Sequence, residues 1–252
     1  MTPPYIEAQQ PDVASGLPWR LEEIDFSKLE PERARHDDTL FFFLVMSSFV
    51  EAASDLYTRN LSAYYAGDHE VEHWLRDHWE HEEIQHGRAL RTYVRAVWPE
   101  FDWERANAGF FAEYSAMCTL DEFEPTRSLE MAARCVVETG TSALYRAIHR
   151  YTDEPLLKEL TRHIKRDEVR HFSYFYRFYQ RYSAVEAVSR GAHSTRDPEA
   201  HRRGEERGFP GCVSACVSGA LPRNTVPRPV LPRIQLEAEG HHAAALSVRD
   251  VG

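Results

Sequence analysis

The sequence predicts an all-α protein built on an antiparallel four-helix bundle with one extra short helix. Between residues 36 and 183 the only prolines are Pro99, Pro125 and Pro155, and they divide this region into long stretches without a helix breaker. Apolar residues in these stretches recur at helical spacing, and no segment shows the alternation typical of a strand. Helices of about 25 to 30 residues joined by tight turns favour a bundle.

The first predicted hairpin has its turn at the sequence "AGDH". One helix is expected to run from about residue 38 to residue 65, and the next from about residue 68 to residue 97, before "WPEFD". A shorter helix is predicted within residues 102–119. The glycine and the short polar residues of "AGDH" are typical of a turn between helices.

The second predicted hairpin has its turn at "YTDEP". Its first helix is expected to begin near Thr126, whose hydroxyl can cap the N-terminus. Its second helix is expected to begin with Asp153 as the cap and Pro155 in the first turn, and to end at about residue 181.

Composition divides the chain into three parts: an N-terminal arm over residues 1–35, the helical domain over residues 36–190, and a tail over residues 191–252. Six of the 14 prolines follow residue 190, and Phe209 is the only aromatic residue after Tyr182. Such a segment cannot bury enough apolar surface to offset its chain entropy, so we predict that the tail is disordered.

Charge and hydropathy restrict the partners and the location of the protein. The formal net charge of -10 argues against nucleic acid as the partner. No apolar run approaches the roughly 18 residues that span a bilayer, and the N-terminus lacks the features of a signal peptide. We therefore expect a cytoplasmic protein without a membrane span. The four cysteines do not have metal-site spacing and are expected to be reduced thiols.

A Glu-x-x-His motif places a carboxylate and an imidazole on one helix face. It occurs three times, as Glu70/His73, Glu83/His86 and Glu168/His171. The last two copies interrupt the apolar stripe of their helices, where an ionised carboxylate is costly unless it is paired or coordinated. A buried Glu–His hydrogen bond within each helix is the simpler alternative, but it does not explain why two helices carry the same interruption.

Turn symmetry in the first hairpin selects a partner for Glu83. Residues equidistant from the turn of an antiparallel hairpin lie at the same depth. Glu83 follows Gly67 by sixteen residues, and Glu51 precedes Gly67 by sixteen residues. The pair Glu70/His73 lies beside the turn and has no mirrored acid, so we predict that it lies on the surface.

The second hairpin repeats this relation. Glu168 and Glu138 lie fifteen residues on either side of Asp153. In both hairpins the acids are therefore roughly 24 Å from the turn along a helix. Four carboxylates and two histidines are predicted to converge at this level: Glu51, Glu83, His86, Glu138, Glu168 and His171.

This donor set fits two divalent metal ions. Structural zinc sites favour thiolates and more imidazoles, and calcium does not favour histidine. One Glu from each of two helices and Glu-x-x-His from each of two others is the arrangement of ferritin-like di-iron or di-manganese proteins. We expect two iron ions, with manganese or a mixed manganese–iron pair left open.

The motifs "EEIQHG" (82–87) and "RDEVRH" (166–171) resemble those of the ferritin-like di-iron carboxylate oxidases, most closely the soluble acyl-carrier-protein desaturases. The resemblance covers about residues 38–183 and implies the same six ligands. It also implies that Glu82 holds His171 and that Asp167 holds His86. Thr141 would lie on the oxygen-binding side of the metals, whereas a hydrogen bond back to its own helix is the alternative role for this hydroxyl.

The function expected from this resemblance is that of a dioxygen-activating di-iron oxidoreductase, either an oxidase, an oxygenase or a desaturase-like enzyme. The substrate would be a small or carrier-bound organic molecule, such as an apolar acyl chain. A separate ferredoxin or reductase would supply electrons, because the sequence shows no flavin or nicotinamide motif. An N-oxygenase or small-molecule oxidase on the same scaffold, ferritin-type iron storage, peroxide removal and a homodimeric assembly remain open.

Overall fold

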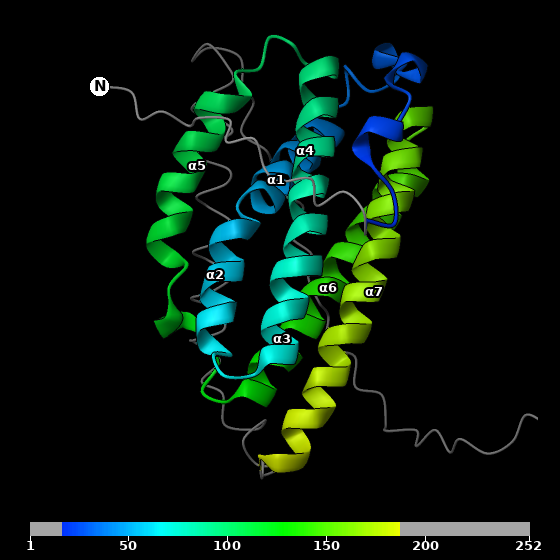
Figure 1. The fold of residues 1–252 in the computed structure, drawn as a ribbon. Helices are drawn as coiled ribbons and strands as arrows, with labels where there is room; N and C mark the ends of the chain where they lie inside the picture. Colours follow the sequence, from blue (N-terminus) through cyan, green and yellow to red (C-terminus); the bar gives the residue numbers. More distant parts are fainter. Residues whose placement is uncertain (1–16, 187–252) are drawn as a thin grey trace, which may run out of the picture. The chain divides into compact units, whose positions relative to one another are not determined.

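The computed structural model describes residues 17–186, and the predicted tail at residues 191–252 lies outside this part. Every regular element within it is helical and no strand occurs there, which confirms the all-α class (Figure 1). No single described helix has the length and hydropathy needed to cross a membrane, although the helices Asp38–Ala52 and Ser54–Tyr64 together pass this test as a bent pair.

The first predicted helix is divided in two. Helix α1 spans Asp38–Ala52 and α2 spans Ser54–Tyr64, with a bend of 44° between them. The prediction of one continuous helix from 38 to 65 was therefore wrong. The Ser54 hydroxyl donates to the carbonyl oxygen of Glu51, and the N–H of Ala53 bonds three residues back. Both bonds compete with the regular helical ladder.

The turn of the first hairpin lies at Gly67, as predicted. Its φ of 90° belongs to the left-handed region, which glycine adopts without steric cost. The second arm then continues through α3 (His69–Trp74), a π-helical turn η4 (Leu75–Trp79) and α4 (Glu80–Val97). The predicted helix from 68 to 97 therefore contains one π-turn, a feature that often accompanies functional sites.

Helix α5 (Trp103–Met117) is the predicted short helix, and a single 3-10 turn, η5 (Leu120–Glu122), follows it. Asp102 caps α5 by accepting a hydrogen bond from the backbone of Arg105. In Figure 1, α5 lies beyond α1 and α2, on the side away from α7.

The second hairpin consists of α6 (Arg127–Tyr151) and α7 (Pro155–Val185), which pack against each other. Thr126 caps α6, as predicted. The expected cap of α7, Asp153, was wrong. Glu154 takes this role, because its buried carboxylate accepts two backbone N–H groups of the first turn.

The described part of the predicted arm contributes to the core. It forms three 3-10 turns, η1 (Leu21–Glu23), η2 (Phe26–Lys28) and η3 (Pro31–Arg33). Trp19 precedes them and belongs to the main hydrophobic cluster. Gln85 of α4 anchors this segment, since its side-chain amide donates to the carbonyl oxygen of Trp19 and its oxygen accepts from the next turn.

Two hydrophobic clusters fill the interior at different levels. One contains Leu44, Phe49, Leu90 and Ile164, and the other contains Leu61, Trp79, Met131 and Phe175. Along α4 and α7 the Glu-x-x-His motifs fall between members of the two clusters. The interior therefore has a polar layer enclosed between two apolar layers.

Candidate metal centre

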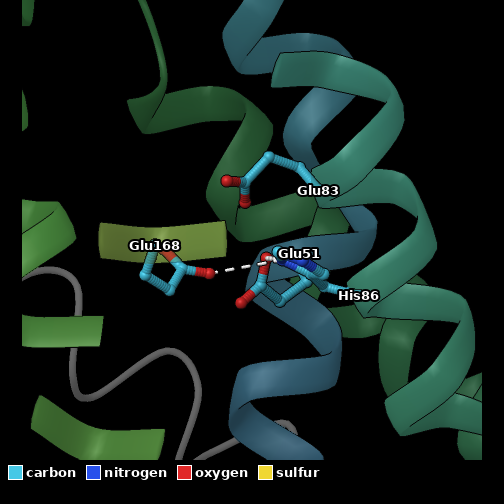
Figure 2. A group of neighbouring side chains, drawn as sticks. All are labelled: Glu51, Glu83, His86 and Glu168. Carbon is cyan, nitrogen blue, oxygen red and sulfur yellow. Dashed lines mark ion pairs between the residues drawn. The ribbon is translucent and has the colours of Figure 1, made fainter. Parts of the chain in front are cut away.

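Helices α1, α4, α6 and α7 bring together all six side chains that turn symmetry and the motifs selected. They form two groups, within each of which one atom per residue lies within 4.8 Å of the others. The first group is Glu51, Glu83, His86 and Glu168, and Figure 2 shows their side chains meeting in one space. The second group is Glu83, Glu138, Glu168 and His171. Glu83 and Glu168 belong to both, as carboxylates that bridge two ions would.

Each of the six side chains has one buried nitrogen or oxygen that makes no hydrogen bond of normal geometry and lies only at ion-pair distance from the other ligand atoms, for example 3.0 Å between His171 Nδ1 and Glu83 Oε1. These atoms are Glu51 Oε2, Glu83 Oε1, His86 Nδ1, Glu138 Oε2, Glu168 Oε1 and His171 Nδ1. Buried polar atoms are normally hydrogen-bonded, and leaving one without a partner costs on the order of 1–3 kcal/mol. Metal coordination would satisfy all six atoms at once, so the residues fit a pair of cations.

The opposite nitrogens of the two histidines are already occupied. The Nε2–H of His86 donates to Asp167 at 3.0 Å, and the Nε2–H of His171 donates to Glu82 at 2.7 Å. Each imidazole is thereby oriented with Nδ1 toward the cluster. These contacts agree with the pairing that the resemblance implies, and such partners fix the ring orientation of a ligating histidine.

Two further residues, which the sequence analysis did not single out, support these acids. Arg170 donates both to Glu82 and, at 3.0 Å, to Asp167, so one guanidinium links the two carboxylates. Trp19 donates from its indole nitrogen to Asp167 at 2.7 Å. Arg170 stands three residues after Asp167, a spacing that could have indicated this contact, whereas nothing in the sequence connects Trp19 with the site.

The remaining Glu-x-x-His copy lies outside the cluster, on the surface. Glu70 pairs with Arg177 at 2.8 Å, and both side chains are more than half exposed. His73 is also exposed and pairs with Asp77 along its own helix. Identical spacing thus occurs in two different environments, and burial separates them.

No protein-family model, curated protein or solved structure matches this chain.

Thr141 makes the hydrogen bond back to its own helix that was the alternative role for its hydroxyl. Its hydroxyl lies 3.1 Å from the carbonyl oxygens of Val137 and Glu138 in its own helix. It also lies 3.0 Å from Oε2 of Glu168. A half-buried hydroxyl therefore touches a carboxylate shared by both groups.

The electrostatics of the cluster differ from residue to residue. Burial raises the pKa of Glu138 to about 8 and raises the pKa of Glu83 well above its ordinary value. Burial opposes the charge on His86 and His171, but the carboxylates in close contact with both imidazole nitrogens outweigh it and raise the pKa of both side chains. Burial also opposes the charge on Glu168, yet the two histidines in close contact with its carboxylate hold its pKa well below the usual range.

Metal binding is expected to strengthen as the pH rises and to release protons. In the metal-free protein the raised pKa values keep the imidazoles of His86 and His171 and the carboxyl of Glu138 protonated near neutral pH, and a cation must displace those protons. The imidazolium charges stabilise the metal-free fold below the ordinary histidine pKa of about 6.5, and this contribution is lost as the pH rises through the raised values.

Calorimetric titration with cobalt(II) in buffers of different ionisation enthalpy measures the number of protons released. Affinity should increase between about pH 6 and pH 8, with protons released at the lower pH. An affinity that does not change with pH would contradict coordination by these groups.

Proposed function

We propose that this chain is a non-haem di-iron oxidoreductase that uses dioxygen, built on a ferritin-like four-helix bundle. The observation that carries the proposal is the convergence of six buried ligand atoms from four helices into two groups, with none of these atoms hydrogen-bonded to a described residue outside the ligand set. The resemblance of "EEIQHG" and "RDEVRH" to di-iron carboxylate oxidases supports the same assignment.

The donor set suits iron. The four glutamates carry four negative charges when ionised, which two divalent cations balance. Hard carboxylate oxygens together with one imidazole for each ion are ligands that iron(II) and manganese(II) accept. When bound, the metal pair would supply the redox chemistry that activates dioxygen, with its electrons replaced from outside the chain.

The protein supplies orientation and exclusion of water. The two hydrophobic clusters enclose the polar layer on both sides along the helices, so charges within it are weakly screened. Glu82 and Asp167 hold the imidazoles, and Arg170 holds these two acids together. The Thr141 hydroxyl, bonded to Glu168, is a group that can hold or pass a proton beside the metals.

The substrate that we propose is an apolar organic molecule, such as an acyl chain, free or bound to a carrier. Electrons would come from a separate ferredoxin or reductase. The deciding experiment is a single turnover: anaerobic loading with iron(II), then exposure to oxygen with candidate acyl or amine substrates, followed by mass spectrometry. We expect two iron ions per chain and an oxidised organic product. Mineral growth on repeated iron addition, without such a product, would instead indicate iron storage.

A further inference from the structure

Four of the six proposed ligands have a second atom held by a residue outside the ligand set. Asp167 and Glu82 accept from Nε2 of the two histidines, and Thr141 contacts Oε2 of Glu168. The fourth contact is made by Tyr145, whose hydroxyl donates to Oε1 of Glu51. Among the described residues, Glu83 and Glu138 accept no hydrogen bond from outside the ligand set.

This difference divides the two metal positions. The first group contains Glu51, which Tyr145 holds, and the second contains Glu138, whose carboxylate no residue of 17–186 outside the ligand set holds. The other members are symmetric, since each position has one supported histidine and both share the same two carboxylates. The two positions therefore differ only in the carboxylate that they do not share, which a tyrosine holds in the case of Glu51 and not in the case of Glu138.

Glu51 stands where its helix ends, and Tyr145 reaches its carboxylate from another helix. Glu51 lies in the last turn of α1, next to the 44° bend, so its backbone is not part of a continuous helix on both sides. Tyr145 stands on α6, seven residues after Glu138, and its ring is 1% exposed. Its hydroxyl donates to Oε1 of Glu51, so Oε2, which accepts no hydrogen bond, is left 3.7 Å from Nδ1 of His86.

We propose that Tyr145 is a positioning residue that makes the metal position formed by Glu51, Glu83, His86 and Glu168 the tighter of the two. This inference rests on the proposed function only in requiring that two ions bind. A cation entering the first position meets a carboxylate that is already oriented. A cation entering the second position must first fix Glu138, and ordering a side chain on binding reduces affinity.

The test is a titration of the metal-free protein with cobalt(II), followed by calorimetry and by the visible absorption of the bound ion. The wild type should bind in two resolved steps. Tyr145→Phe should weaken the first step by about 10–100-fold, the usual effect of removing a group that orients a ligand, so that the two steps merge.

Tyr65→Phe is the matched control. Tyr65 is equally buried, and its hydroxyl donates to the backbone oxygen of Arg127 at 2.8 Å, in a part of the molecule that contains no proposed ligand. Both variants lose one hydrogen bond of a buried tyrosine, but only Tyr145→Phe should change the metal titration. An unchanged two-step titration in Tyr145→Phe would overturn the inference, and so would equal weakening of both steps.

If Tyr145→Phe does not fold, a second pair of variants tests whether the two metal positions differ in affinity. Glu51→Gln should remove the tight step, and Glu138→Gln should remove the weak one. The reverse assignment would overturn the inference while leaving the two-metal proposal intact. A wild-type protein that binds fewer than two cobalt ions would instead count against the proposed function.

Discussion

Alanine in place of Glu138 is expected to lower the metal content of the chain from two ions to one, and alanine in place of Glu168 to lower it to almost none. Glu138 belongs only to the second group of donors, whereas Glu168 belongs to both. Removing a shared carboxylate takes one donor from each cation. Metal analysis after anaerobic iron(II) loading and desalting measures the stoichiometry of each variant directly.

Glu70→Ala is the control for this series, because Glu70 also stands three residues before a histidine. Its carboxylate is exposed and paired with arginines, so its removal should leave two ions bound. Exposed ion pairs contribute little to stability, about 0–1 kcal/mol, and this variant should fold normally. Equal metal loss in Glu70→Ala and Glu138→Ala would contradict the assignment of the site.

The depth of the site within the helices could be predicted from residue numbers alone, because residues equally far from the turn of a helical hairpin lie opposite each other. Glu51 and Glu83 stand at equal distance from Gly67, although neither arm of the hairpin is a regular helix. The first arm contains the bend at Ala53, and the second contains the π-turn at Leu75–Trp79. Each arm has one irregularity between the turn and its acid, and the two acids still meet.

The supporting residues were beyond sequence reasoning for different reasons. Tyr145 stands on the same face of α6 as Glu138, but an aromatic residue on a core face is ordinary packing and does not by itself indicate a contact with a carboxylate. Trp19 reaches Asp167 from a proline-rich segment with no helical periodicity. Such contacts depend on how distant segments pack, which local spacing does not encode.

Alanine in place of Gly87 is expected to destabilise the protein by about 1–3 kcal/mol and to weaken metal binding, as overpacking of a close contact does. Gly87 follows His86 on α4 and faces the last turn of α1. A Cβ atom at this position would lie 2.8 Å from the backbone nitrogen of Ala52 and 3.0 Å from the carbonyl carbon of Glu51. Both are backbone atoms, so no side-chain rotation can relieve the clash.

The consequence for the site follows from which atoms must move. To accommodate the methyl group, α1 must withdraw from α4 at the residue that carries the Glu51 carboxylate. Glu51 and His86 would then no longer converge on one cation, and the tighter metal position should lose affinity while the second position is affected less. Denaturant unfolding of the metal-free protein and cobalt(II) titration measure the two effects separately.

Gly109→Ala provides the comparison for this substitution. Gly109 is an exposed residue within α5, and a Cβ there would meet nothing within 4 Å. Alanine at this position should stabilise the protein by roughly 0.5–1 kcal/mol, since glycine is unfavourable in a helix interior. Gly87→Ala could instead be stabilised to the same degree and bind metal normally. In that case the close contact of α1 with α4 would not be what brings Glu51 and His86 together at one metal position.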